Sequence, residues 1–166
     1  MAQHSTRVLD PIDRVSEVIF GVLMAMTFIG TLNVATAGRQ EVRTVMLAAL
    51  GCNVAWGLTD AVMYLVAIAT ERTRERIRPR LGWTDFRGAF GVFLLVAVST
   101  FPLVVPFIVF RELAPAFLAS RLIAVAMLFL GGWLLARDAG GTPWIAGVAM
   151  AAIGALLLAA LMALGG

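Results

Sequence analysis

Residues 88–110 read GAFGVFLLVAVSTFPLVVPFIVF, an apolar run without one charged side chain. A helix rises about 1.5 Å per residue, so this run is long enough to cross a hydrocarbon core of about 30 Å. Backbone N–H and C=O groups find no water in that core, and a helix pairs them within a single segment. The stretch therefore predicts a membrane-spanning helix, which sets the class of the whole protein.

Four more apolar runs of similar length occur in the chain, at residues 15–36, 44–70, 114–136 and 142–164. Hydrophobic residues make up 61% of the sequence and charged residues only 14%. A water-soluble fold needs more polar surface than this composition can supply. We therefore expect an all-α integral membrane protein, with five transmembrane helices in one membrane domain that covers residues 1–166.

The arginines indicate how these five spans are oriented. All 13 basic residues are arginine, and nine of them lie in the N-terminal segment, the second loop and the fourth loop. Arginine beside a span is retained on the cytoplasmic side during insertion, so we expect a cytoplasmic N-terminus and an outside C-terminus. The arginines form no basic face interleaved with aromatic side chains, which argues against nucleic acid as a partner despite the net charge of +3.

Asp60 is the acid expected near the middle of the second span. An acidic side chain there costs about 2.5–3.5 kcal/mol on insertion scales, and a bound proton or a bound cation would each relieve that cost. The same helix face carries Asn53 seven residues earlier and Met63 three residues later. A metal ion and a proton could therefore compete for this face. The alternative is a neutral Asp60 that hydrogen-bonds across helices to Thr27, Asn33 or Ser99.

Other candidate metal ligands lie on the first span and at the end of the second. Met24 offers a thioether, a soft ligand that suits some transition metals, although methionine in an apolar helix also serves as filler. Glu71 and Glu75 are one helical turn apart and could share a cation with Glu17 if the first two spans are neighbours. The alternative for these glutamates is solvated ion pairing with the nearby arginines.

The fifth span predicts a close helix contact, because small residues recur in it every four positions. In a membrane such residues let two helix backbones approach each other. The predicted ridge consists of Gly147, Ala151, Ala155, Ala159 and Ala163, and the alternative is an alanine-rich helix that faces lipid. In the third span, Pro102 and Pro106 remove two backbone donors and predict a kinked or locally opened helix.

Enzymatic chemistry has little support in the sequence. There is no phosphate-binding glycine loop and no pair of thiols, because Cys52 is the single cysteine, and the single histidine is His4 in the N-terminal tail. We expect no enzyme and no permanently bound cofactor.

Several motifs resemble the vacuolar iron transporter family over nearly the whole chain. They are STFPLVVPF at 99–107, LFLG at 128–131, and the stretch from Ala136-Arg137 to GGTPW at 140–144, together with the Arg- and Glu-bearing extension after the second span. The resemblance is to a short, divergent, bacterial-type member. Family members are homodimers that move ferrous iron and manganese out of the cytosol in exchange for protons, along a path between the subunits. The resemblance implies such an exporter of Fe²⁺ or Mn²⁺ in the inner (plasma) membrane of a bacterium.

Two features depart from the family pattern. Typical members carry an Asp-Gly pair early in the first span as a metal ligand, whereas residues 21–26 read GVLMAM. Members also often carry a glutamate-rich helical domain between spans two and three, and the loop at 70–87 is too short for it. Asp60 is then the mid-membrane carboxylate that could replace the missing ligand, beside Met63 or a first-span methionine. The alternatives are a non-transporting membrane scaffold or regulatory subunit with the same fold, and a channel for protons or monovalent ions.

Overall fold

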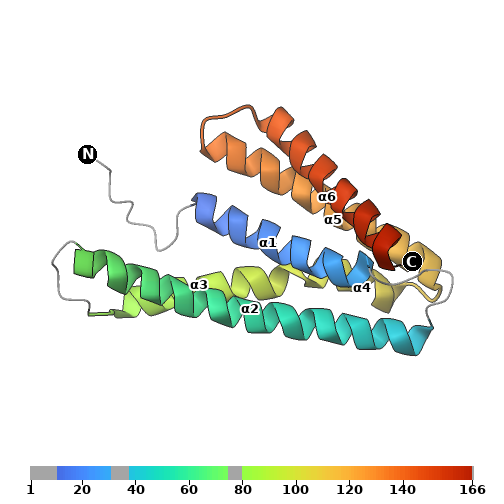
Figure 1. Ribbon diagram of the computed structural model, residues 1–166, viewed down its shortest axis with the longest axis horizontal. Helices are drawn as coiled ribbons and strands as arrows, with labels where there is room; N and C mark the ends of the chain where they lie inside the picture. Colours follow the sequence, from blue (N-terminus) through green and yellow to red (C-terminus); the bar gives the residue numbers. More distant parts are fainter. Residues whose placement is uncertain (1–10, 31–37, 75–79, 166) are drawn as a thin grey trace.

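The computed structural model describes residues 11–30, 38–74 and 80–165, and within these ranges it is helical apart from short connections (Figure 1). The described helices are α1 (Pro11–Gly30), α2 (Arg39–Arg74), α3 (Trp83–Ser99), α4 (Phe101–Val109), α5 (Leu113–Asp138) and α6 (Pro143–Gly165). The described residues contain no strand. The predicted all-α class is confirmed.

Four stretches of the described chain are long and apolar enough to cross a membrane. They are Arg39–Arg74, Trp83–Val109, Leu113–Asp138 and Pro143–Leu164. The helix α1 is not among them, because Asp13, Arg14 and Glu17 occupy its first two turns. The rest of the predicted first span, residues 31–36, lies outside the described residues. The chain is thus an all-α membrane protein with four candidate membrane-spanning helices, and the fifth span stays a prediction.

The helix α1 lies at the centre of the molecule. It contacts each of the other described helices, with the α2–α3 pair on one side and the α5–α6 pair on the other (Figure 1). Its side chains Val22, Ala25, Met26 and Ile29 are buried in the main apolar cluster. Gly21 allows the crossing with α3, because a Cβ at this position would lie 2.9 Å from the Val96 carbonyl oxygen.

The predicted third span is interrupted at Thr100, between α3 and α4. The interruption falls where Pro102 and Pro106 withhold backbone N–H groups from the helix. The neighbouring helix supplies a polar contact there, because the Ser120 hydroxyl of α5 donates to the Leu103 carbonyl oxygen at 2.7 Å. The interruption expected in this helix is therefore present, and a hydrogen bond from α5 stabilises it.

Most of the small-residue ridge predicted on the fifth span does not lie against another described helix of this chain. Gly147 is buried against Phe129, but Ala155, Ala159 and Ala163 are exposed within this chain. A spacing of four residues exceeds the 3.6-residue turn, so such a ridge rotates steadily around its helix. The contact with α5 instead continues through Gly154, which lies against Leu128, and Figure 1 shows α5 and α6 side by side.

The second helix extends well beyond the predicted 44–70 and holds the start of α3 at its end. With 36 residues, α2 is about 54 Å long, which exceeds the hydrocarbon core of about 30 Å. The Arg72 guanidinium donates to both Asp85 carboxylate oxygens, at 2.8 and 2.9 Å. The Gly82 N–H donates to the same carboxylate at 2.7 Å. These contacts join α2 to the first turn of α3 at the arginine-rich end.

Candidate functional site

A buried hydrogen bond sets the register between α1 and α2, which run in opposite directions. The Asn53 side-chain amide donates to the Gly21 carbonyl oxygen at 3.0 Å. From this contact, Glu17 lies four residues back along α1 and Asp60 seven residues forward along α2. At about 1.5 Å per residue these steps are about 6 Å and about 10 Å, and Asp13 lies about 12 Å back. Asp60 therefore sits between the levels of Glu17 and Asp13.

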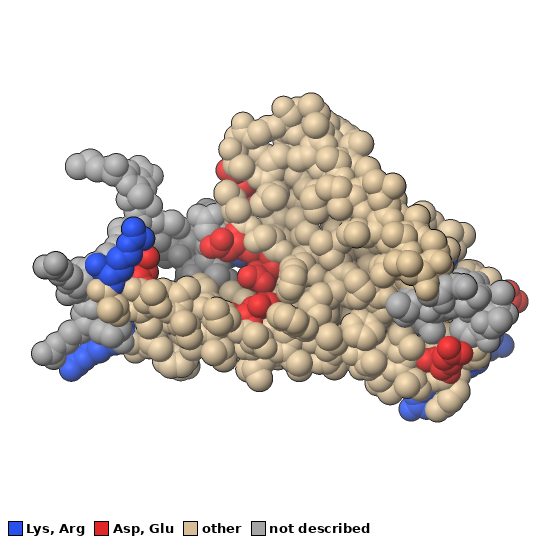
Figure 2. Space-filling view, viewed as in Figure 1, with Lys and Arg blue, Asp and Glu red and all other residues tan. Residues whose placement is uncertain are grey.

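Asp60 lines two adjoining cavities between α1 and α2. One of about 380 Å³ is also lined by Asp13, Glu17 and Met63, and the other of about 330 Å³ by Glu17 and Ser16. Figure 2 shows acidic side chains gathered in the hollow beside α2. Met63 is 57% exposed, so it forms the outer rim rather than the floor. The fold thus brings together three of the predicted metal ligands, Glu17, Asp60 and Met63.

The acidic side chains of this cavity have no basic partner among the described residues. The ion pairs among the described residues join Arg72 to Asp85, Arg74 to Glu71 and Arg137 to Asp138. One carboxylate oxygen of Asp60, Oδ2, is shielded from solvent and has no hydrogen-bond partner in the described structure. Glu17 and Asp60 are half-buried and Asp13 is exposed, and carboxylates that lie close together repel when ionised, so a bound proton or cation would stabilise the group.

The cross-helix hydrogen bonds considered for a neutral Asp60 are not present in the described residues. The Thr27 hydroxyl donates to the Met24 carbonyl oxygen at 2.7 Å, and the Ser99 hydroxyl to the Val96 carbonyl oxygen at 2.7 Å. Asn33 lies outside the described residues. The Asp60 carboxyl group is therefore not satisfied by either of the hydroxyls predicted for it.

Three of the remaining predicted ligands, Asn53, Met24 and Glu71, lie away from these cavities. Asn53 is fully buried, and its amide contacts Gly21 and the Thr100 hydroxyl, a position that ties three helical segments together. Met24 is half-buried on α1 and lines neither cavity. Glu71 is exposed and lies 3.9 Å from Arg74. Glu75 lies outside the described residues.

The sequence interpretation did not include Asp13 in the site. Asp13 and Glu17 are four residues apart on α1, and this spacing places both on one helix face. This four-residue spacing could have added Asp13 to the site, because Glu17 was already a candidate ligand. The sequence did not predict that Glu17 lies near Asp60. Glu17 was grouped with Glu71, because both lie near the ends of their predicted spans, whereas the observed register of α1 against α2 places Glu17 beside Asp60.

The described residues contain no group of three His, Cys, Asp or Glu side chains close enough together to hold a metal ion. The acids of the cavity are neighbours without forming a closed ligand shell. No protein-family model matches this chain, and no curated protein matches it.

Proposed function

We propose that this protein transports a divalent transition metal, iron or manganese, across a membrane, and that it exports the ion from the cytosol in exchange for protons. The observation that carries the proposal is the Asp60 carboxyl group, whose Oδ2 has no partner among the described residues in a cavity shared with Glu17 and Met63. Carboxylate oxygens with one thioether suit Fe²⁺ or Mn²⁺ better than Mg²⁺ or Ca²⁺.

In this mechanism Asp60 carries either a proton or the metal ion. Asp13 lies nearer than Asp60 to the arginine-rich, cytoplasmic end and attracts a cation from that end, and Glu17 lies beyond Asp60 on the other side of the cavity. The ion displaces the proton from Asp60, and its charge offsets the repulsion between the carboxylates. A proton that arrives from the opposite side then takes its place on Asp60 and releases the ion. The displaced proton leaves to the cytosol, so each cycle at Asp60 moves one metal ion out and one proton in.

The proposal includes the surrounding architecture. The helix α1 is the first of five spans, the N-terminus is cytoplasmic, and the protein lies in the inner membrane of a bacterium as a homodimer. Beside the cavity, α2 exposes Trp56 and Met63, with 45% and 57% of their surfaces accessible. A second copy that covered this face would complete the surroundings of the ion between the two subunits.

Metal flux into proteoliposomes tests the role of Asp60. We expect Asp60→Asn to lower Mn²⁺ or Fe²⁺ flux at least tenfold and to abolish its dependence on a pH gradient, because an amide cannot exchange a proton for a cation. Glu41→Gln is the matched control, since Glu41 is an exposed carboxylate on the same helix and lines neither cavity. Equal flux for the native chain and Asp60→Asn would remove Asp60 from the mechanism.

A second candidate function is a membrane scaffold or regulatory subunit that does not transport. It is favoured by the lack of a three-ligand group among the described residues. Saturable binding separates the two candidates, because a transporter must bind its ion and a scaffold need not. If the purified protein binds no Fe²⁺, Mn²⁺ or Co²⁺ at any pH between 5 and 8, roughly the range over which proteins of this kind stay folded, the scaffold replaces the transporter.

A further inference from the structure

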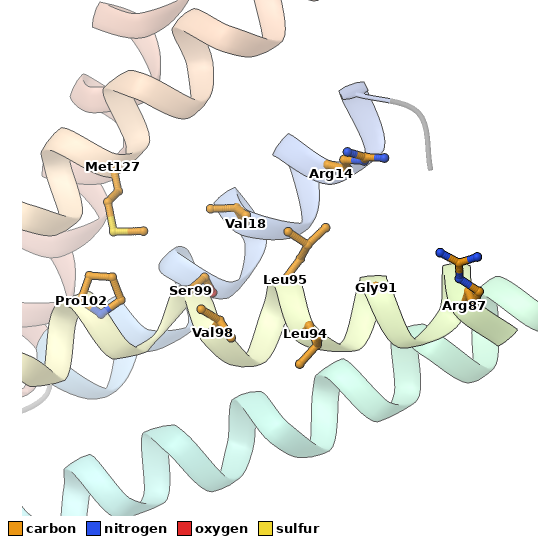
Figure 3. A pocket seen from close by; sticks show the side chains of 10 residues that line it. All are labelled: Arg14, Val18, Arg87, Gly91, Leu94, Leu95, Val98, Ser99, Pro102 and Met127. Atoms are coloured by element: carbon orange, nitrogen blue, oxygen red, sulfur yellow. The ribbon is translucent and has the colours of Figure 1, made fainter. Parts of the chain in front are cut away.

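A separate cavity of about 670 Å³ lies between α1, α3 and α5 (Figure 3). Its walls are mainly apolar and include Val18 of α1, Leu94, Leu95 and Val98 of α3, and Met127 of α5. Leu94 is 41% exposed and Val98 is 53% exposed, so the cavity opens to the outer surface of the helices. In a membrane that surface meets lipid chains.

Two arginines stand at one end of this cavity. Figure 3 shows Arg14 of α1 and Arg87 of α3 at the same end, and Pro102 and Met127 at the other. Neither guanidinium group forms an ion pair or hydrogen bond with a described residue. No acidic side chain of the described part of the chain lines the cavity. Within the described residues, the end between α1 and α3 therefore offers an anion two arginines that have no ion-pair partner.

The dimensions of the cavity match one leaflet of a bilayer. Its lining on α3 and α4 extends from Arg87 to Pro102, a distance of about 22 Å at about 1.5 Å per residue. Half of a hydrocarbon core of about 30 Å is about 15 Å, and the headgroup region adds several more. A lipid whose headgroup lies at the arginines would thus reach the far end with its acyl chain.

We propose that this cavity binds one anionic phospholipid. Its phosphate lies between Arg14 and Arg87, where paired guanidinium groups give charge-assisted hydrogen bonds, and one acyl chain lies along Leu94 and Val98 toward Met127. The arginine-rich end places the headgroup in the cytoplasmic leaflet, and this choice of leaflet rests on the proposed orientation. The site itself is independent of metal transport.

Lipid binding by the full chain in a neutral detergent tests the proposal. The probes are phosphatidylglycerol and phosphatidylcholine with identical acyl chains, and native mass spectrometry measures their apparent affinities. We expect phosphatidylglycerol to bind at least tenfold more tightly, and Arg14→Gln with Arg87→Gln to remove that preference. Arg74→Gln with Arg80→Gln is the matched control, since it removes two charges from the same end outside this cavity.

A second pair of variants tests the acyl-chain path. Val98→Trp fills the cavity while leaving both arginines in place, and we expect it to weaken binding of both lipids at least fivefold. Leu122→Trp is its control, because Leu122 is 61% exposed and does not line the cavity. If the double glutamine variant fails to fold, Arg14→Lys with Arg87→Lys keeps the charges and should retain the preference. Asp60→Asn should bind lipid as the native chain does, whatever its flux.

Four results would overturn the lipid site. The first is equal affinity for the two lipids, and the second is an equal loss of preference in the Arg74 and Arg80 control. The third is inorganic phosphate raising the melting temperature as much as phosphatidylglycerol does, which would leave the apolar walls without a role. The fourth is efficient cross-linking of Cys52→Ala, Val98→Cys chains to one another in the membrane, which would mean that a second copy covers the cavity.

Discussion

Asn53 has no exposed surface, and its side-chain amide reaches two other helical segments from α2. It donates to the Gly21 carbonyl oxygen of α1 and contacts the Thr100 hydroxyl at the interruption between α3 and α4. Gly21 accepts the bond close to the point where α1 crosses α3. In hydrocarbon a buried amide needs such partners, because water cannot replace them. Asn53, predicted as a metal ligand, therefore occupies a position that joins helices.

We predict that Asn53→Ala lowers the free energy of unfolding by about 0.5–2 kcal/mol, the range for a buried side-chain hydrogen bond between membrane helices. Melting of the purified protein in detergent measures the loss. Thr59→Ala is the control, because the Thr59 hydroxyl bonds only to the Ala55 carbonyl oxygen of its own helix. If Asn53→Ala instead lost metal flux at an unchanged melting temperature, Asn53 would be a metal ligand rather than a packing residue.

The crossings between helices depend on where glycine removes a side chain. At Gly21, a Cβ would lie 2.9 Å from the Val96 carbonyl oxygen and closer still to the Ser99 hydroxyl. At Gly57, a Cβ would lie 3.0 Å from the Phe93 carbonyl oxygen of α3. Both positions therefore let a neighbouring backbone approach, as packing in membranes requires. The central position of α1 between the two helix pairs depends on the first of them.

We predict that Gly21→Ala destabilises the protein by about 1–3 kcal/mol, because the added methyl group pushes α1 away from the α3 backbone. Gly51→Ala is a matched control in α2, since no atom lies within 4 Å of a Cβ there. The control should be neutral or stabilising by up to about 1 kcal/mol, the gain of alanine over glycine in a helix. Equal melting temperatures for the two variants would show that α1 and α3 do not cross as described.

The whole molecule has two ends with different connections. The end of α2 and the start of α3 lie at the same end as the α5–α6 connection, and the connection from α4 to α5 lies at the other (Figure 1). The first end carries Arg72, Arg74, Arg80, Arg87 and Arg137. Arginine beside membrane spans marks the cytoplasmic side, so the arrangement of the helices agrees with the distribution of charge.

Labelling of single cysteines with an impermeant maleimide in intact cells checks this orientation. In a Cys52→Ala background, we predict that Glu112→Cys reacts from outside, whereas Leu81→Cys and Ala139→Cys react only after the cells are opened. All three positions are exposed in the described structure. External labelling at Leu81→Cys or Ala139→Cys would reverse the orientation and with it the direction proposed for metal export.

The apolar runs alone were enough to predict helices close to their observed positions, because backbone groups in hydrocarbon must pair within their own segment. Pro102 and Pro106 likewise predicted the interruption at Thr100, because the loss of a backbone N–H group disturbs the helix within about one turn of the proline. The candidate ligands Asp60 and Met63 were found in the same way, from one helix face.

The neighbours of Asp60 were decided only by how the helices pack. Glu17 and Asp13 reach it because Asn53 and Gly21 set the register of α1 against α2. A related reason explains why the predicted ridge does not pack on α5 at Ala155. The contact between α5 and α6 follows the 3.6-residue turn of the helix rather than a spacing of four residues. Periodicity within one helix shows which residues share a face, but the level at which two faces meet depends on side chains from both helices.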